Sequence, residues 1–158
     1  MNLKKPKFWD LEKPNLIAYL LLPFTIILNI NNFVLKFTNK KKFKDIKTIC
    51  VGNIYLGGTG KTPTSLYIYN MMKKLNFNVT TAKKFNANHF DEAKLLKKKS
   101  KFVSLKQRVE IVKTSIDKNY DMIIFDDGLQ EKSLDYDIKF VCFDATKWIG
   151  NGCLIPSG

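Results

Sequence analysis

The feature that most constrains the fold is a glycine-rich segment, Gly57-Gly58-Thr59-Gly60-Lys61-Thr62, between an apolar run and an amphipathic stretch. The run before it, 46–51 (IKTICV), is rich in β-branched residues and predicts a strand. The stretch after it, 63–75, places apolar residues at helical spacing and begins with a proline, which the first turn of a helix tolerates. A strand, a glycine-rich loop and a helix in this order predict a P-loop in an α/β fold.

The residues of this loop have the chemistry of a phosphate-binding site. Its glycines let the backbone turn so that successive N–H groups, including that of Thr59, point at phosphate oxygens. The start of the following helix adds a partial positive charge. Lys61 can reach the β and γ phosphates, and the hydroxyl of Thr62 can bind Mg²⁺. We therefore expect a nucleoside triphosphate and Mg²⁺ as ligands of the loop.

The rest of the chain continues the alternation of strands and helices. Further strands are expected at 79–82, 102–103, 122–125 and 138–143, and further helices at 90–101 and 107–118. Such alternation predicts a parallel sheet flanked by helices, so the expected class is α/β, like a P-loop NTPase.

Two aspartates end the apolar run MIIF at 122–125. Because the carboxyl ends of neighbouring parallel strands meet at one edge of a sheet, Asp126 and Asp127 are expected beside the phosphates. We assign the metal to Asp126 and a catalytic role to Asp127, although the sequence leaves open which of the two touches Mg²⁺. Capping of the next turn is the alternative role for the pair. Gln130 follows closely enough to reach the same phosphates.

The N-terminal region is apolar and flanked by lysines. Residues 16–28 (LIAYLLLPFTIIL) carry no charge, but the stretch is shorter than the roughly 20 apolar residues of a membrane-spanning helix and contains Pro23. An amphipathic helix over 14–37 that lies on a membrane surface is the preferred interpretation, ahead of a buried packing helix and of a true span. We accordingly divide the chain into a membrane-associating helix with a basic linker, 1–42, and a nucleotide-binding domain, 43–158.

The composition narrows the possible partners. The net charge is +13, but Arg108 is the only arginine, and one arginine is few for reading bases. Nucleic acid is therefore not expected as a partner, although an ATPase that binds nucleic acid remains the third hypothesis. The three cysteines are widely spaced without a CxxC pattern, which favours neither a disulfide framework nor a zinc site.

Several short motifs together resemble the tetraacyldisaccharide 4'-kinases of lipid A synthesis. That family also lacks the first glycine of the general P-loop pattern, where this chain has Tyr55. The resemblance covers nearly the whole chain, and its motifs are Val51 to Ile54, Gly57 to Pro63, Asp126 to Gln130, Leu134 to Asp137, Phe143 to Ala145, Gly150 to Gly152, Leu154 and Pro156 to Gly158.

The resemblance implies transfer of a phosphoryl group from ATP to the 4' hydroxyl of an acylated glucosamine disaccharide. It also implies a peripheral or monotopic location on the cytoplasmic face of the inner membrane, where the lipid acceptor lies. In the family, an aspartate in a segment like Gly-Asp-Glu-Pro acts as the catalytic base. Phe90 to Ala93 match this segment here, so the resemblance implies that Asp91 is the base. In this reaction Lys61 and Mg²⁺ would neutralise the charge that develops on the transferred group.

The chain departs from the family pattern in several respects, among them a much shorter stretch between Phe85 and Asp91. Ala82-Lys83-Lys84-Phe85 stands where the family has Ser-Arg-Gly-Tyr, and Glu131 stands where it has histidine. Family members also continue into a second α/β lobe that closes over ATP. The second hypothesis is therefore a truncated or degenerate nucleotide-binding protein without kinase turnover.

Overall fold

The structure is a computed structural model that describes residues 6–36, 40–53, 59–85, 90–131, 133–146 and 148–157. The chain forms two compact units. The first comprises residues 1–38, 54–58 and 143–158, and the second comprises residues 39–53 and 59–142. The expected division after residue 42 stays a prediction about domain organisation.

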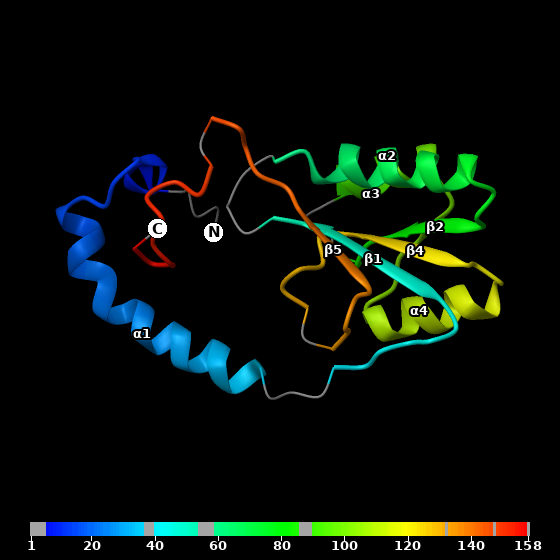
Figure 1. Cartoon of the computed structure of the whole chain (residues 1–158), viewed down its shortest axis with the longest axis horizontal. Coiled ribbons are helices and arrows are strands. Elements are labelled where there is room, and N and C mark those ends of the chain that lie inside the picture. The colour runs from blue at the N-terminus through cyan, green and yellow to red at the C-terminus, as the bar shows by residue number, and fades with distance from the viewer. Residues whose placement is uncertain are drawn as a thin grey trace. The chain divides into compact units, whose positions relative to one another are not determined.

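The second unit contains a five-stranded, fully parallel sheet (Figure 1). In spatial order its strands are β3 (Phe102–Val103), β2 (Val79–Ala82), β4 (Met122–Asp126), β1 (Lys47–Gly52) and β5 (Ile138–Val141). Because β4 is inserted between β1 and β2, the carboxyl ends of these three strands are neighbours at one edge. Ligands of open α/β sheets bind at this kind of edge, where the order of strands reverses.

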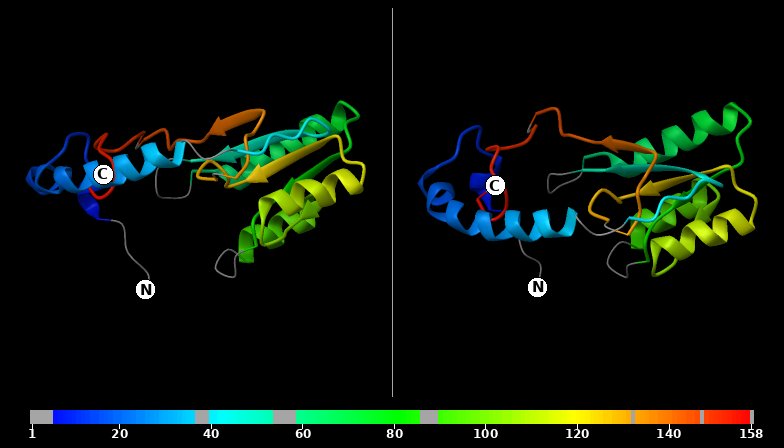
Figure 2. Two further views of the ribbon diagram at one scale, coloured as in Figure 1. Left: turned by 90° about the horizontal axis from the view of Figure 1, so that it is seen from below. Right: turned by 60° about the horizontal axis from the view of Figure 1, so that its bottom comes forward.

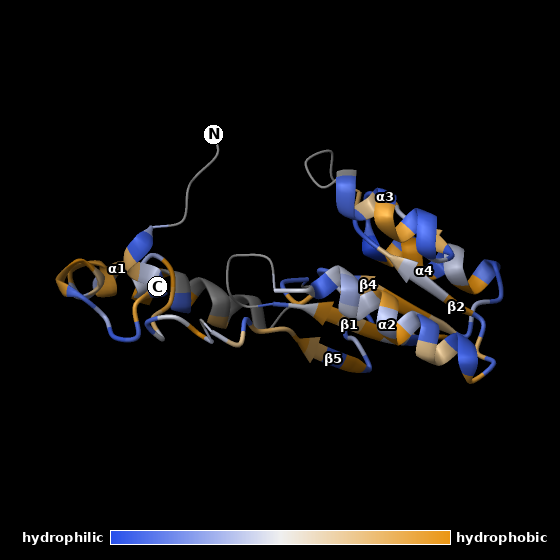
Figure 3. Ribbon diagram, turned by 90° about the horizontal axis from the view of Figure 1, so that it is seen from above, coloured by the Kyte–Doolittle hydropathy of each residue, from blue (hydrophilic) through white to orange (hydrophobic). Residues whose placement is uncertain are grey.

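Two helices cover opposite faces of the sheet, α2 (Lys61–Lys74) on one side and α4 (Arg108–Asp117) on the other (Figure 2). The side chains of a strand alternate between its faces. Ile124 therefore packs with Ile68 and Tyr69 of α2, while Ile123 packs with Ile111 of α4. Both faces of β1 and β4 are covered, which explains their continuous apolar runs (Figure 3).

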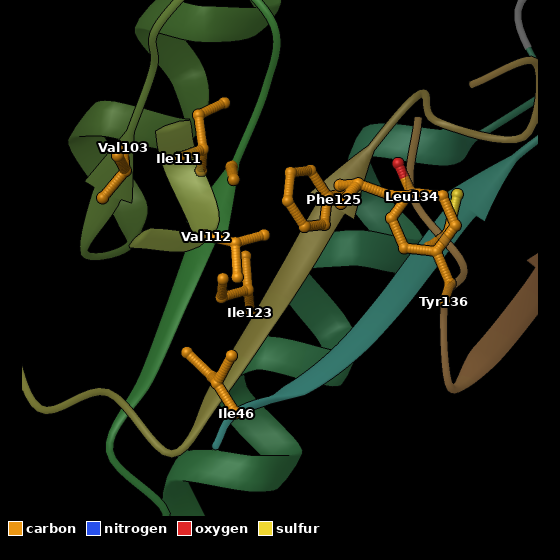
Figure 4. Packing of buried hydrophobic residues seen from close by; sticks show 10 residues of the cluster. Ile46, Val103, Ile111, Val112, Ile123, Phe125, Leu134 and Tyr136 are labelled. Carbon is orange, nitrogen blue, oxygen red and sulfur yellow. The ribbon is translucent and has the colours of Figure 1, made fainter. Parts of the chain in front are cut away.

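The core on the α4 side extends beyond the sheet to the segment that precedes β5 (Figure 4). Tyr136 of this segment packs edge-on against Phe125 of β4, with ring centroids 5.3 Å apart. The remaining helix, α3 (Phe90–Lys99), contacts α2 and buries Leu96 completely.

The first unit contains the helix α1 (Leu16–Lys36), a short 3₁₀ helix η1 (Lys7–Asp10) and the C-terminal segment. Asn151 joins this segment to η1, since its amide donates to the carbonyls of Ser157 at 2.8 Å and Phe8 at 3.4 Å. Trp9 donates its indole N–H to the carbonyl of Pro156 at 3.0 Å. The motifs around 150–157 therefore hold the unit together.

Most apolar side chains described on α1 are exposed, and only Ala18 and Thr25 are buried. Within the described part of the chain, no helix combines the length and apolarity that crossing a membrane requires.

The expected α/β class with a parallel sheet is confirmed, and every expected strand and helix is present with small differences at its ends. No end differs by more than two residues: α2 begins two residues earlier than expected, at Lys61, α1 begins two residues later, and α3 and β5 each end two residues earlier. Lys61 and Thr62 thus belong to the first turn of α2 rather than to the loop before it.

Candidate phosphate and metal site

Polar side chains from three neighbouring strands gather at the carboxyl edge of the sheet. Asn53 follows β1, Lys83 follows β2, and Asp126 and Asp127 end and follow β4. The parallel register aligns β4 with both of its neighbours, so residues next in sequence to the strand ends lie next to one another in space. The candidate site is built at this edge and at the start of α2.

Lys61 lies at the N-terminus of α2, after Gly60 in the left-handed conformation with φ of 75°. Its Nζ donates to Asn53 Oδ1 at 2.9 Å and to Asp127 Oδ1 at 3.1 Å. These two contacts fix the ammonium group at the end of the sheet, beside the helix N-terminus that favours anions. Gly57 and Gly58, the other expected phosphate-binding glycines, lie outside the described residues.

Asp126 is completely buried, and both oxygens of its carboxylate accept hydrogen bonds. Thr62 donates to Oδ2 at 2.9 Å, Ser65 donates to Oδ1 at 3.1 Å, and Lys83 donates to Oδ2 at 2.9 Å. A buried carboxylate requires such partners because an unpaired charge is strongly disfavoured away from water. The two residues expected to hold the metal, Thr62 and Asp126, are therefore in direct contact.

Asp127 differs from its neighbour because its side chain is 44% exposed and points to Lys61. Its backbone adopts the left-handed conformation, with φ of 65°, which is uncommon for a residue other than glycine. Two hydrogen bonds fix this conformation. The Asp127 N–H donates to the Val51 carbonyl at 2.8 Å, and Arg108 donates to the Asp127 carbonyl.

Gln130 lines a pocket of about 330 Å³ together with Lys84, Arg108, Asp127 and Glu131. Glu131, which stands where the family has histidine, forms an ion pair with Arg108 and accepts hydrogen bonds from Ser133. Burial is the largest single influence on the pKa of Glu131, and by itself it would raise this pKa. The hydrogen bonds from Ser133 and Arg108 outweigh burial and lower the pKa to about 2.

Asp91, the implied base, lies exposed in the first turn of α3. The side chain next to it, Glu92, forms an ion pair with Lys83. The structure therefore connects the segment of Asp91 to the site through Glu92 and Lys83, and brings Lys61, Thr62, Asp126 and Asp127 together at the edge of the sheet.

The residues present fit a phosphate and a metal ion. The hydroxyl of Thr59 is buried without a partner among the described residues, and the space where a side chain at Gly60 would lie is open. No group of three or more His, Cys, Asp or Glu side chains in the described ranges is arranged to hold a metal ion. Thr62 and Asp126 supply two neighbouring oxygen ligands, and proteins often hold Mg²⁺ through one or two side chains together with phosphate oxygens.

Sequence reasoning missed four residues that the site uses, namely Asn53, Ser65, Lys83 and Arg108. Ser65 lies one helical turn after Thr62, so its position on the same face of α2 could have been inferred. In the sequence, Lys83 stands out only as the replacement of an arginine of the family pattern. The pairing of Arg108 with Asp127 and Glu131 depends on tertiary packing and has no local signal.

Comparison with known proteins identifies the family. The sequence model of the tetraacyldisaccharide-1-P 4'-kinases matches residues 16–82 and 78–158. A tetraacyldisaccharide 4'-kinase from Pelagibacter ubique is 48% identical over 160 residues, which cover 100% of this chain and 50% of that protein. The enzyme of the same name from Rickettsia africae is 33% identical over 174 residues, which cover 100% of this chain and 54% of that protein.

A solved structure shares the fold. The crystal structure of LpxK from Aquifex aeolicus in complex with ATP matches with a TM-score of 0.70 and 22% identity, covering 90% of this chain and 53% of that chain. The chain spans about half the length of the curated relatives it matches. Because the matches to the family model together cover residues 16–158, the chain belongs to the tetraacyldisaccharide 4'-kinase family.

Proposed function

We propose that the chain binds ATP at the start of α2 and transfers its γ-phosphoryl group to the 4' hydroxyl of a tetraacyldisaccharide 1-phosphate, a precursor of lipid A. The observation that carries this proposal is the position of Lys61, whose ammonium lies between Asn53 and Asp127 at the sheet edge. The family relationship supplies the acceptor class, and the ATP complex of the Aquifex protein supports ATP as donor.

Each side chain has a distinct role in this proposal. Backbone N–H groups of Gly57 to Gly60 and the start of α2 bind the phosphates, and Lys61 balances charge on the transferred group. Gln130 contacts the nucleotide from the neighbouring pocket. Asp127 orients Lys61, to which it is hydrogen-bonded.

Thr62 and Asp126 would hold Mg²⁺, which when bound supplies additional positive charge beside the phosphate oxygens. Asp91 is proposed to accept the proton of the acceptor hydroxyl. It lies in the first turn of α3, whose start is tied to the site through Glu92 and Lys83.

The test is phosphoryl transfer from radiolabelled ATP to the lipid disaccharide, with ATP binding measured in parallel. We expect Lys61→Ala to lower transfer by about 100-fold or more, because it removes the charge that is preorganised for the transition state. Lys74→Ala is the matched control, since Lys74 lies exposed in the last turn of the same helix. Transfer that survives Lys61→Ala would refute the mechanism. ATP binding without transfer by the native chain would favour a nucleotide-binding protein without turnover.

We also propose that α1 lies on the cytoplasmic face of the inner membrane. The helix presents large exposed apolar side chains, among them Leu20, Ile27 and Phe33. Lysines at both ends of the apolar region would face anionic headgroups. Cosedimentation with vesicles should therefore increase with anionic lipid and decrease when Leu20 and Ile27 are both replaced by Asp. The matched control is Tyr67→Asp, at an exposed position of α2. Equal sedimentation of all three proteins would contradict the proposal.

A further inference from the structure

Lys83 is a buried cation held between two carboxylates. Its side chain is only 6% exposed, and its Nζ donates to Asp126 Oδ2 at 2.9 Å and also to Glu92 Oε2. Lysine is almost never fully buried unless it is paired. The position of Lys83 directly after β2 allows its side chain to run along the sheet edge towards β4, the adjacent strand.

The two partners of Lys83 belong to different parts of the proposed reaction. Asp126 contacts Thr62 and belongs to the proposed metal site. Glu92 lies in the first turn of α3, next to Asp91. We propose that Lys83 is a positioning residue that sets the Asp91–Glu92 turn of α3 against the carboxylate of Asp126. This inference rests on the proposed role of Asp91 in the transfer.

The two carboxylates beside Lys83 favour its charged form. Burial alone would lower its pKa and is the largest influence. The nearby carboxylates of Asp126 and Glu92 outweigh burial and raise the pKa above its ordinary value. A protonated lysine can donate to both carboxylates at once, which a neutral amine would do weakly.

Other contacts hold the far end of α3, so Lys83 is not needed to place the whole helix. Leu96 is fully buried, and Ser100 after the helix is hydrogen-bonded to Thr81 of β2 at 2.6 Å. The next residue, Lys101, donates its N–H to the Tyr69 hydroxyl of α2 at 3.2 Å. The contact between Lys83 and Glu92 acts on the opposite end, the turn that carries Asp91.

Hydrogen exchange of the full chain tests this role without requiring turnover. In Lys83→Met and in Glu92→Gln, we expect amides of the first turns of α3 to exchange about tenfold faster or more, because a charge-assisted hydrogen bond is lost. Amides of β1 and β4 should keep their protection. Lys83→Arg should restore slow exchange, since arginine can bridge the same carboxylates. Lys94→Met is the control for loss of a lysine on exposed α3 surface.

Kinetics then separate positioning from nucleotide binding. If the chain transfers phosphate, Glu92→Gln should lower kcat about tenfold or more and leave the KM for ATP within about twofold, because Lys61 and its partners are unchanged. Unchanged exchange in both Lys83→Met and Glu92→Gln would overturn the inference, and so would a KM for ATP that rises as much as kcat falls. Absence of turnover in the native chain would contradict the proposed function, while the exchange result would still decide whether Lys83 holds the turn.

Discussion

Gly128, in the turn after Asp126 and Asp127, has little room for a side chain. A methyl group at this position would lie 2.8 Å from the Tyr136 hydroxyl oxygen and 2.9 Å from Cys50 Sγ. Both neighbours are buried, and the Tyr136 ring is fixed by its edge-on contact with Phe125. The neighbours of Gly128 cannot move away without disturbing the core, so we predict that Gly128→Ala destabilises the protein.

The magnitude follows from two opposing effects. Overpacking by one methyl group in a close-packed site costs about 1–3 kcal/mol. Replacing glycine by alanine also reduces the entropy of the unfolded chain, which stabilises the folded state by about 0.4–1 kcal/mol. The net loss in the free energy of unfolding should be about 1–2 kcal/mol, equivalent to a fall in Tm of about 2–8 °C for a chain of this size.

Urea unfolding followed by circular dichroism measures this loss, and a double-mutant cycle identifies its cause. The Tyr136 hydroxyl is buried without a partner among the described residues, so Tyr136→Phe removes the nearest clashing atom without breaking a hydrogen bond. Gly128→Ala should therefore be less destabilising in the Tyr136→Phe background. Equal losses in both backgrounds would show that contact with the Tyr136 hydroxyl is not the reason.

Two further predictions concern stability. The folded-state pKa of Glu131 is lowered to about 2 from 4.5, so its contribution is fully present above about pH 4.5 and is lost as pH falls towards 2. The difference in urea stability between the native chain and Glu131→Gln should therefore shrink between pH 6 and pH 3, and a constant difference would contradict this. In the first unit, Asn151→Ala removes the hydrogen bonds to the carbonyls of Ser157 and Phe8. Because the C-terminal segment is then held less firmly, limited proteolysis within residues 143–157 should become faster. Asn70→Ala, at an exposed position of α2, should leave the cleavage rate unchanged.

Local sequence signals predicted the elements well because each signal agrees with the tertiary structure. The apolar runs of β1 and β4 are covered on both faces, and the helical spacing in 63–75 gives the face of α2 that packs on the sheet. The spatial order of the strands has no comparable local signal. The insertion of β4 between β1 and β2 places Asp126 within reach of both α2 and Lys83.

The site could be predicted only where a motif is continuous in sequence. Lys61, Thr62 and the two aspartates belong to such motifs, whereas Lys83, Glu92 and Arg108 act through partners distant along the chain. In one case, the residue that the motif indicates and the residue that makes the contact are neighbours rather than the same residue. The sequence drew attention to Asp91, but the carboxylate that contacts the buried lysine is that of its neighbour Glu92.

Two of the residues that depart from the expected family pattern, Lys83 and Glu131, lie near the aspartate pair, and each has a charged partner. Lys83 forms an ion pair with Asp126, so a positive charge is retained at this position. Lysine lacks the planar guanidinium of the family's arginine and is a less directional donor. Glu131 engages Arg108, which also donates to the carbonyl of Asp127. Both aspartates are therefore held in place despite the changes.

The substitution at 131 has an electrostatic consequence as well. The pocket beside Asp127 is lined by the cations Lys84 and Arg108 and by the carboxylates of Asp127 and Glu131, so its formal charges cancel. A neutral histidine in place of Glu131 would leave the pocket with a net positive charge and Arg108 without this carboxylate partner. Under the proposed function, phosphate is therefore attracted by Lys61 and the start of α2 rather than by the pocket. Raising the charge of the pocket by Glu131→His should for this reason strengthen ATP binding, provided that Arg108 still holds the Asp127 carbonyl.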